Sequence, residues 1–348
     1  MMKIRLCTLK CLVILLGVAS LMTIAGRNLY QESFVTEDSN IFKETQVAKQ
    51  FFNPLGTSCK PEPLLDSIAR LNGMFDDLKT FVMFIGYSQT IESRTGAILD
   101  AHPQIILPQE YDVLGNWKMY QNKKLRERGK QKYMLFFFLH YLSTFQAIFR
   151  NQANKSSQFW VWTSKVESAR YYPLSDTWQG ITNGKIKVIG DTSSGSTTRQ
   201  LTRNQGNFTV LEDIQNVIGI PLKFLHTITN PYEVIALNVM RQSRSAVEIN
   251  DAKDVFALVE TNAQIRKLYG DAVLDISTDD YINNPRETMI QICRFLQVTC
   301  YNSYLDKVEK ELNKESTRAR DQVIWTDEEK EWVAAEINKY SFLKSFEF

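Results

Sequence analysis

The stretch that decides the fold is F-V-M-F-I-G-Y-S-Q-T-I-E-S-R-T-G-A-I-L-D-A-H-P, residues 81–103. Its first five residues are all apolar and predict a buried strand, and the pattern from about Ser93 to Ala101 predicts a helix. A strand, a loop and a helix in this order offer backbone amides and a positive helix end to an anion. The loop lacks the G-K-S or G-K-T ending of a Walker A motif, which argues against ordinary ATP or GTP hydrolysis.

Short apolar runs and helical patterns alternate along the rest of the chain. Runs of this kind predict strands at Ile186–Ile189, Lys223–Ile228 and Val273–Ile276, with a short strand at I-I-L, residues 105–107. Helical patterns cover Val234–Ser243, Asp254–Leu268 and Pro285–Leu296, and the apolar run Tyr133–Leu142, too short to span a bilayer, predicts a buried helix. Strands that alternate with helices predict an α/β fold with a mostly parallel sheet.

The N-terminus predicts a membrane anchor. Residues 1–10 carry Lys3, Arg5 and Lys10 and no acid, and Cys11–Gly26 has no charge. The positive-inside rule keeps this end cytosolic, so we expect a tail and signal anchor at 1–26, a stem at 27–75 and a lumenal domain at 76–348. The alternative is a cleaved signal peptide and a secreted protein, since Thr23 and Ala25 give a small-x-small ending.

Composition excludes several classes of protein. The 348 residues are 44% hydrophobic and 23% charged, which is typical of a globular chain, and a net charge of +2 argues against a general nucleic-acid binder. Two N-glycosylation sequons, at Asn154 and Asn207, agree with a lumenal domain. Cys293 and Cys300 are seven residues apart, and we leave open whether they pair in an oxidising lumen or stay as buried thiols.

Several segments resemble, in order and spacing, the membrane-bound Golgi-type carbohydrate sulfotransferases. They are F-V-M-F-I-G-Y-S, L-D-A-H-P, P-Q-E-Y-D-V, K-V-I-G-D (187–191), K-F-L-H-T-I-T-N-P-Y-E-V-I-A (223–236), D-D-Y-I-N-N-P-R-E-T-M-I-Q-I-C-R-F-L (279–296) and the ending from W-T-D-E-E to Phe348. The resemblance implies a P-loop NTPase-like three-layer sandwich. It also implies transfer of a sulfuryl group from 3′-phosphoadenosine 5′-phosphosulfate (PAPS) to a hydroxyl of a glycan or similar acceptor, without a metal.

The same resemblance implies site residues. Glu110, six residues past His102-Pro103, is the candidate general base, because the acceptor hydroxyl must lose a proton as it attacks sulfur. His102 is the next candidate. The donor site would be built from Gly86, Tyr87, Ser88, Gln89, Thr90, Ile91, Glu92, Ser93, Arg94, Thr229, Leu237, Arg318 and Arg320.

This donor site departs from the family pattern. Where the family has a loop such as R-S-G-T-T, this chain has Gln89 in place of the cation and Ile91 in place of the glycine, and Glu92 adds a negative charge. Thr229 and Leu237 stand where the family has an arginine and a serine for the 3′-phosphate. Losing one phosphate-binding cation costs roughly 2–4 kcal/mol in a dry site.

Other residues offer replacements. The arginines at 94, 199, 203, 318 and 320 are candidate cations, and S-S-G-S-T-T, residues 193–198, is a candidate phosphate-binding turn. Two functions therefore stay open: an active PAPS-dependent sulfotransferase, or a sulfotransferase-fold binding or scaffold protein without catalysis. A Golgi glycosyltransferase is a weaker third, because the chain has no D-x-D triplet for a metal-bound nucleotide sugar.

Overall fold

The computed structural model describes residues 73–87, 92–109, 111–121, 131–150, 177–182, 185–312 and 318–348, without the side chains of 92, 93, 145, 148–150, 311 and 312. All of them belong to one compact unit, residues 63–348. The predicted anchor at 1–26 and nearly all of the stem lie outside the described residues. Among the described helices, none is at once long and apolar enough to cross a bilayer.

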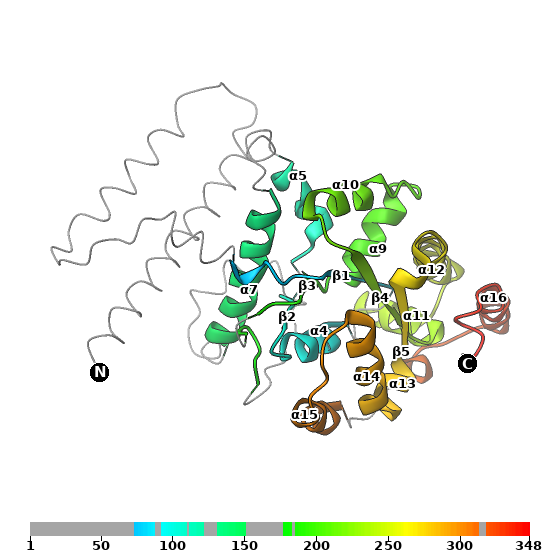
Figure 1. Cartoon of the computed structure of the whole chain (residues 1–348). Coiled ribbons are helices and arrows are strands. Elements are labelled where there is room, and N and C mark those ends of the chain that lie inside the picture. Colours follow the sequence, from blue (N-terminus) through cyan, green and yellow to red (C-terminus); the bar gives the residue numbers. More distant parts are fainter. Residues whose placement is uncertain are drawn as a thin grey trace, which may run out of the picture. The chain divides into compact units, whose positions relative to one another are not determined.

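A five-stranded sheet forms the centre of this unit (Figure 1). Its strands are β1 (Thr80–Gly86), β2 (Ile105–Ile106), β3 (Val188–Asp191), β4 (Leu222–Ile228) and β5 (Val273–Ser277). They pair in the order β2-β3-β1-β4-β5, and every pair is parallel. Every residue of β1 is buried, as its unbroken apolar run predicts for a strand covered on both faces.

Helices cover both faces of the sheet, because successive side chains of each strand point to opposite sides. Phe81, Met83 and Ile85 pack against α5 (Val113–Tyr120), α7 (Gln131–Arg150), α9 (Ser194–Arg203), α10 (Thr209–Ile218) and α12 (Ile249–Tyr269). Val82 and Phe84 pack against α4 (Glu92–Asp100), α13 (Thr278–Asn283), α14 (Pro285–Leu296) and α15 (Asn302–Leu312). In Figure 1, α4, α14 and α15 lie below the sheet and α9 and α10 above it.

The order of the strands fixes the direction of the crossovers. The connection from β1 outward to β2 runs through α4 on one face, and the connections back toward β5 run through α5, α7, α9, α10 and α12 on the other. Crossover connections that move in opposite directions across the sheet and pass over opposite faces have the same handedness. The expected P-loop NTPase-like three-layer α/β sandwich is thus confirmed, and all of its sheet is parallel.

A third cluster joins the C-terminal part of the chain to β4. It contains α11 (Pro231–Arg241), part of α12, the 3-10 turn η3 (Ala319–Gln322), α16 (Asp327–Ile337) and the final residues to Phe346. Asn230 caps α11 by accepting from the amide of Tyr232, and Pro231 occupies the first helical turn. The capping box of Thr326 and Glu329 starts α16.

Helix α7 and the cysteine pair Cys293 and Cys300 bear on two further predictions from the sequence. The apolar run Tyr133–Leu142 lies inside α7, so the predicted helix is confirmed, but it is buried only on the side of Leu135, Phe136 and Leu139, and Met134 is 43% exposed. Cys293 and Cys300, which the sequence left open, form a disulfide between the end of α14 and the segment after it.

Candidate functional site

The carboxyl ends of β1 and β3 form the topological switch point of the sheet. The connection after β1 enters α4 on one face, whereas the connection after β3 enters α9 on the other. Chains that leave neighbouring strands in opposite directions open a crevice there, and ligands of α/β proteins bind in that crevice. Strand β1 and the first two residues of the expected donor loop, Gly86 and Tyr87, end at this point.

The first backbone amide of the expected donor loop is bonded inside the protein. The Gly86 N–H donates to Thr198 Oγ1 of α9 over 3.1 Å, and Thr198 Oγ1 donates to Asn262 Oδ1 of α12 over 2.9 Å. All three groups are buried. This amide therefore points toward α9 and α12 and is not offered to a phosphate group, in contrast to the loop amides of an anion-binding turn.

The next residue connects β1 to the end of β4. Tyr87 is 2% exposed, and its hydroxyl donates to the Thr229 carbonyl over 2.5 Å. The Thr229 hydroxyl lies 2.7 Å from that of Thr278, which itself donates to the Ile228 carbonyl. The hydroxyl that replaces the family's arginine is therefore held by a neighbouring side chain.

Two carboxylates stand at the end of β3, where helix N-termini meet. Asp191 is buried and accepts from the amides of Val113, at the start of α5, and Ser193, just before α9. Asp112 accepts from the amide of Gly115 over 3.0 Å and from the Gln200 side chain. Burial raises the pKa of Asp191 to about 6, against the hydrogen bonds from Val113 and Ser193 that lower it.

These carboxylates already compensate the positive ends of α5 and α9. A phosphate or sulfate in the same crevice would meet their negative charge instead of a free helix end. The local electrostatics at β3 thus disfavour a polyanionic donor.

A third carboxylate, Glu233 in the first turn of α11, forms an ion pair with Arg320, one of the expected C-terminal cations. It accepts from the amides of Ala319 over 2.7 Å and Arg320 over 3.3 Å, and it pairs with Arg320 Nε over 3.2 Å. Arg320 also donates to the Glu347 carbonyl over 2.8 Å. The structure therefore brings Arg320 to the N-terminus of α11 and pairs its charge with Glu233. Arg318 is exposed.

The S-S-G-S-T-T run forms the turn after β3 and the first turns of α9. Ser194 and Thr197 are each 1% exposed, and within the described part of the chain their hydroxyls have no hydrogen-bond partner. They are three residues apart and share one face of α9. These hydroxyls are therefore buried polar groups whose hydrogen-bonding capacity no described side chain satisfies.

The other expected site residues have these positions. Leu237 lies on α11 and packs against the C-terminal apolar cluster, and half-buried Arg94 lies in the first turns of α4. The candidate base Glu110 and the loop residues Ser88, Gln89, Thr90 and Ile91 lie outside the described residues, as do the side chains of Glu92 and Ser93. Their roles stay predictions.

His102, the second candidate base, is used structurally. It is fully buried, its Nε2 bonds to the Thr299 carbonyl over 2.9 Å, and its Nδ1 accepts from the amide of Gln104 over 3.2 Å. Burial lowers the pKa of His102 below its usual value. With both nitrogens engaged, His102 is not free to take a proton from an acceptor.

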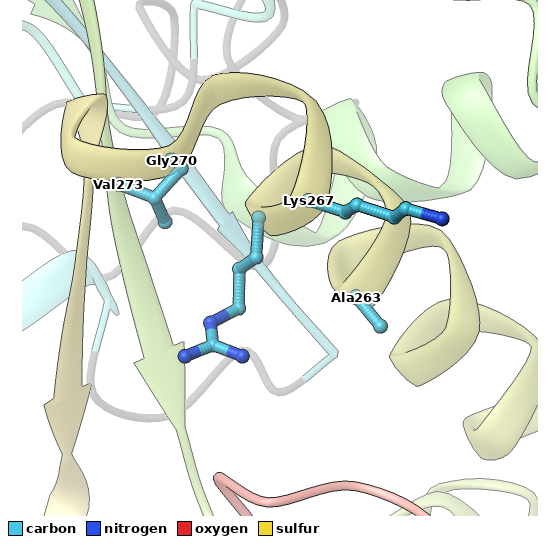
Figure 2. A pocket seen from close by; sticks show the side chains of 5 residues that line it. Ala263, Lys267, Gly270 and Val273 are labelled. Carbon is cyan, nitrogen blue, oxygen red and sulfur yellow. The ribbon is translucent and has the colours of Figure 1, made fainter.

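The described residues show two hollows elsewhere. One, of about 360 Å³, lies beside the turn between α12 and β5, lined by Ala263, Arg266, Lys267, Gly270 and Val273 (Figure 2). The other, of about 330 Å³, is lined by residues of α10 and the end of α12. The first lies at the amino end of β5, opposite to the switch point. Within the described ranges, no three His, Cys, Asp or Glu side chains are grouped to hold a metal.

Sequence and structure comparisons give the following. No family model matches the chain, and no curated protein matches it. Solved structures that resemble it include sulfotransferases. One from Alicyclobacillus acidocaldarius has 12% identity and a TM-score of 0.39, covering 78% of this chain and 97% of that one. The sulfotransferase domain of the Synechococcus olefin synthase has 16% identity and a TM-score of 0.39, covering 71% and 82%.

A mouse sulfotransferase complexed with PAP (adenosine 3′,5′-bisphosphate, the desulfated donor) has 10% identity and a TM-score of 0.33, covering 80% of this chain and 89% of that one.

Sequence reasoning did not indicate the contacts at the ends of β1 and β4. Thr198 belongs to the candidate turn 193–198, but its bond to the Gly86 amide was not expected, and Asn262 and Glu233 were not singled out. These residues are far apart in the sequence, and only the topology of the sheet brings them to β1 and η3. One pattern could have pointed to Glu233: an acidic residue two positions after the proline that starts a helix is well placed to bind amides.

Proposed function

We propose that this chain is a sulfotransferase-fold protein that binds partners without transferring sulfuryl groups. The observation that carries the proposal is the internal bonding of polar groups at the carboxyl ends of β1 and β4. The Gly86 amide, the Thr229 hydroxyl and the Arg320 guanidinium are all engaged by other groups of the chain. A polyanionic donor would have to displace these contacts and approach Asp191, so we expect its affinity to be low.

Calorimetric titration of the purified chain with PAP tests this proposal. We expect a dissociation constant above about 100 µM, against the micromolar range common for enzyme ligands. Gln89→Arg with Ile91→Gly should tighten binding, and adding Thr229→Arg should bring the gain to at least about tenfold, or about 1.4 kcal/mol. The double variant is measured separately, because Thr229→Arg also breaks the bond to Thr278.

The second candidate is an active PAPS-dependent sulfotransferase with a glycan or other hydroxyl acceptor. Its support is the bond from the Ala319 amide to Glu233 in the first turn of α11, the helix of the segment that the resemblance assigns to the 3′-phosphate, since exposed Arg318 directly precedes Ala319. Micromolar PAP binding that is lost on changing Arg318 and Arg320 to Ala would favour this candidate over the first. Glu110→Gln should then lower turnover by roughly 10²–10⁴-fold at unchanged PAP affinity.

The proposed location is the Golgi membrane, as a single-pass protein with a lumenal C-terminal domain, and the alternative is secretion after cleavage. Support comes from the disulfide between Cys293 and Cys300, since disulfides persist in oxidising compartments. Asn207 of the second sequon is exposed between α9 and α10, where a glycan has room.

A further inference from the structure

Glu347 and Phe348 lie across the start of α11, and we call these two residues the strap. The carbonyl oxygen of Glu347 accepts from Asn230 Nδ2 over 2.8 Å and from Arg320 Nη1 over 2.8 Å. Asn230 is the N-cap of α11, and Arg320 belongs to η3. One backbone oxygen of the strap thus takes a hydrogen bond from each of two elements that are distant in the sequence.

The ring of Phe348 holds the strap in place. It contacts the Tyr232 ring edge to face, with the centres 5.1 Å apart, and the Trp325 ring in the same manner at 5.7 Å. Lys330 Nζ lies 4.3 Å from the centre of the Phe348 ring. The receiving rings are themselves fixed, because the Tyr232 hydroxyl donates to the Lys330 carbonyl and Trp325 Nε1 donates to the Arg320 carbonyl. The strap therefore has a defined seat.

The strap is attached to the core but is not part of it. Leu343 is 0% exposed and Phe346 is 7% exposed, and both belong to the C-terminal apolar cluster. Phe348 is 45% exposed, and Glu347 is exposed as well. Segments with few buried contacts open at a lower free-energy cost than the core does. The strap can therefore leave its seat while Leu343 and Phe346 stay packed.

The groups that the strap covers are donors that suit an anion. Glu233 pairs with Arg320 Nε, and the Glu347 carbonyl takes Nη1 of the same guanidinium together with the Asn230 amide. Hydrogen bonds to a charged acceptor are about twice as strong as those to a neutral one. A phosphate oxygen is charged and a carbonyl oxygen is not. A phosphate group at this place would therefore compete with the Glu347 carbonyl for the same two donors.

We propose that the strap is an autoinhibitory contact, which covers the start of α11 and withdraws when an anionic ligand binds there. PAP is a suitable probe, because the segment 223–236, which the resemblance assigns to the 3′-phosphate, contains this helix start. The inference rests on the proposed function, since the strap would be one of the internal contacts that keep the affinity for PAP low.

Calorimetric titration with PAP compares the native chain with a chain that ends at Phe346. Without the strap, we expect the dissociation constant for PAP to fall at least about fivefold, because the Asn230 and Arg320 donors no longer have the Glu347 carbonyl as their partner. Adenosine 5′-monophosphate, which lacks the 3′-phosphate, is titrated in parallel and should show no gain. In Arg320→Ala, the same shortening should change the PAP dissociation constant by less than about twofold.

Matched variants separate the strap from effects of charge and folding. Glu347→Gln removes a negative charge and keeps the carbonyl, so the PAP dissociation constant should stay within about twofold of the native value. Phe348→Ala keeps the Glu347 carbonyl and loses the ring contacts, and it should tighten PAP binding at least about twofold. It serves as the second variant if the shortened chain does not fold, which circular dichroism checks.

A spin label reports the movement of the strap directly. It is attached at Glu347→Cys, after the three cysteines outside the disulfide are changed to Ser. Saturating PAP should increase the share of mobile label, because the strap leaves its seat, and adenosine 5′-monophosphate should not. A label that is equally immobile with and without bound PAP would overturn the proposal.

The titrations also distinguish the strap from the proposed function. A change in PAP affinity of less than about twofold on shortening would overturn the strap and leave the proposed function intact. Equal gains for PAP and adenosine 5′-monophosphate, or no measurable PAP binding by either chain, would overturn it as well. Micromolar PAP binding by the native chain would instead contradict the proposed function, and a fivefold gain on shortening would then still support the strap.

Discussion

Asp100, at the end of α4, shows how one residue joins several parts of the fold. Its carboxylate is buried and accepts from the amides of Leu107 over 2.7 Å and Gly180 over 3.1 Å, and from the Ser143 hydroxyl over 2.8 and 2.9 Å. These donors lie after β2, before β3 and on α7. Burial raises the pKa of Asp100 from 3.8 to about 7, although the hydrogen bonds lower it.

A pH dependence of stability follows from this raised pKa. A carboxyl whose folded-state pKa exceeds its unfolded value stabilises the fold most below the unfolded pKa, near 4, and this contribution is lost as pH rises through about 7. We expect the free energy of unfolding of the native chain to fall between pH 5 and pH 8, by about 2 kcal/mol from this group. Asp100→Asn should remove that part of the slope, because the amide does not titrate, and its effect at pH 5 should be small, because the native carboxyl is also neutral there.

Urea unfolding of both proteins at the two pH values measures these effects. Asp271→Asn, at an exposed position, is the control and should change neither the stability nor its slope. An Asp100→Asn protein that keeps the native pH slope would assign the titration to another group. Asp191, whose pKa is raised to about 6, would be the first to examine.

The role of single residues was the least predictable from the sequence. The resemblance pointed to the stretch that contains Asp100, but nothing in it indicated a carboxylate bonded to groups 7, 43 and 80 residues away. The same holds for Thr198 and Asn262 beside Gly86. Hydrogen bonds between distant segments depend on the tertiary arrangement, which local patterns do not contain.

At the scale of elements, the sequence was far more informative. The predicted helix Pro285–Leu296 has the same bounds in the structure, and the strand predicted at Phe81–Ile85 is one residue longer at each end. The strand predicted at Ile186–Ile189 is found at Val188–Asp191, because pairing with β1 begins at Val188 opposite Thr80. Helix α12 starts five residues before its predicted start, where the Asp251 carboxylate caps the amide of Glu248.

The packing of α4 on the turn after β3 depends on a glycine. A Cβ at Gly96 would lie 2.5 Å from Thr192 Cγ2, so α4 approaches this turn more closely than any other residue would allow. We expect Gly96→Ala to destabilise the protein by about 1–3 kcal/mol through overpacking. This loss outweighs the gain of about 1 kcal/mol that alanine brings inside a helix.

A double-mutant cycle measured by urea unfolding tests this contact. Thr192→Ser removes the crowding methyl group and keeps the hydroxyl that donates to the Pro108 carbonyl. In that background, Gly96→Ala should cost at least 1 kcal/mol less than in the native protein, by about the size of a direct coupling. If Gly96→Ala lowered the free energy of unfolding equally in the native and the Thr192→Ser protein, α4 would not be in close contact with the Thr192 methyl group.

For the whole molecule, the charge and hydropathy pattern of the N-terminus and the two sequons predict where the chain resides. The anchor, the stem and Asn154 lie outside the described residues, so their structure adds nothing to that prediction. The described part contributes the disulfide and the position of Asn207. The Asn207 side chain accepts from the amide of Thr209 over 3.1 Å, just before α10 begins, and both residues are exposed.

Glycosylation in a secretory pathway would report a lumenal location of this chain. A chain with its C-terminal domain in the lumen presents the exposed Asn207 side chain to the glycosylation machinery. We therefore expect glycosidase treatment to increase gel mobility, and Asn207→Gln or Thr209→Ala each to remove one glycan. Asn154→Gln together with Asn207→Gln should abolish the shift. Asn216→Gln, at an exposed asparagine outside any sequon, should leave it unchanged. An unglycosylated chain whose C-terminus is accessible to a cytosolic protease would contradict the lumenal location and, with it, the Golgi proposal.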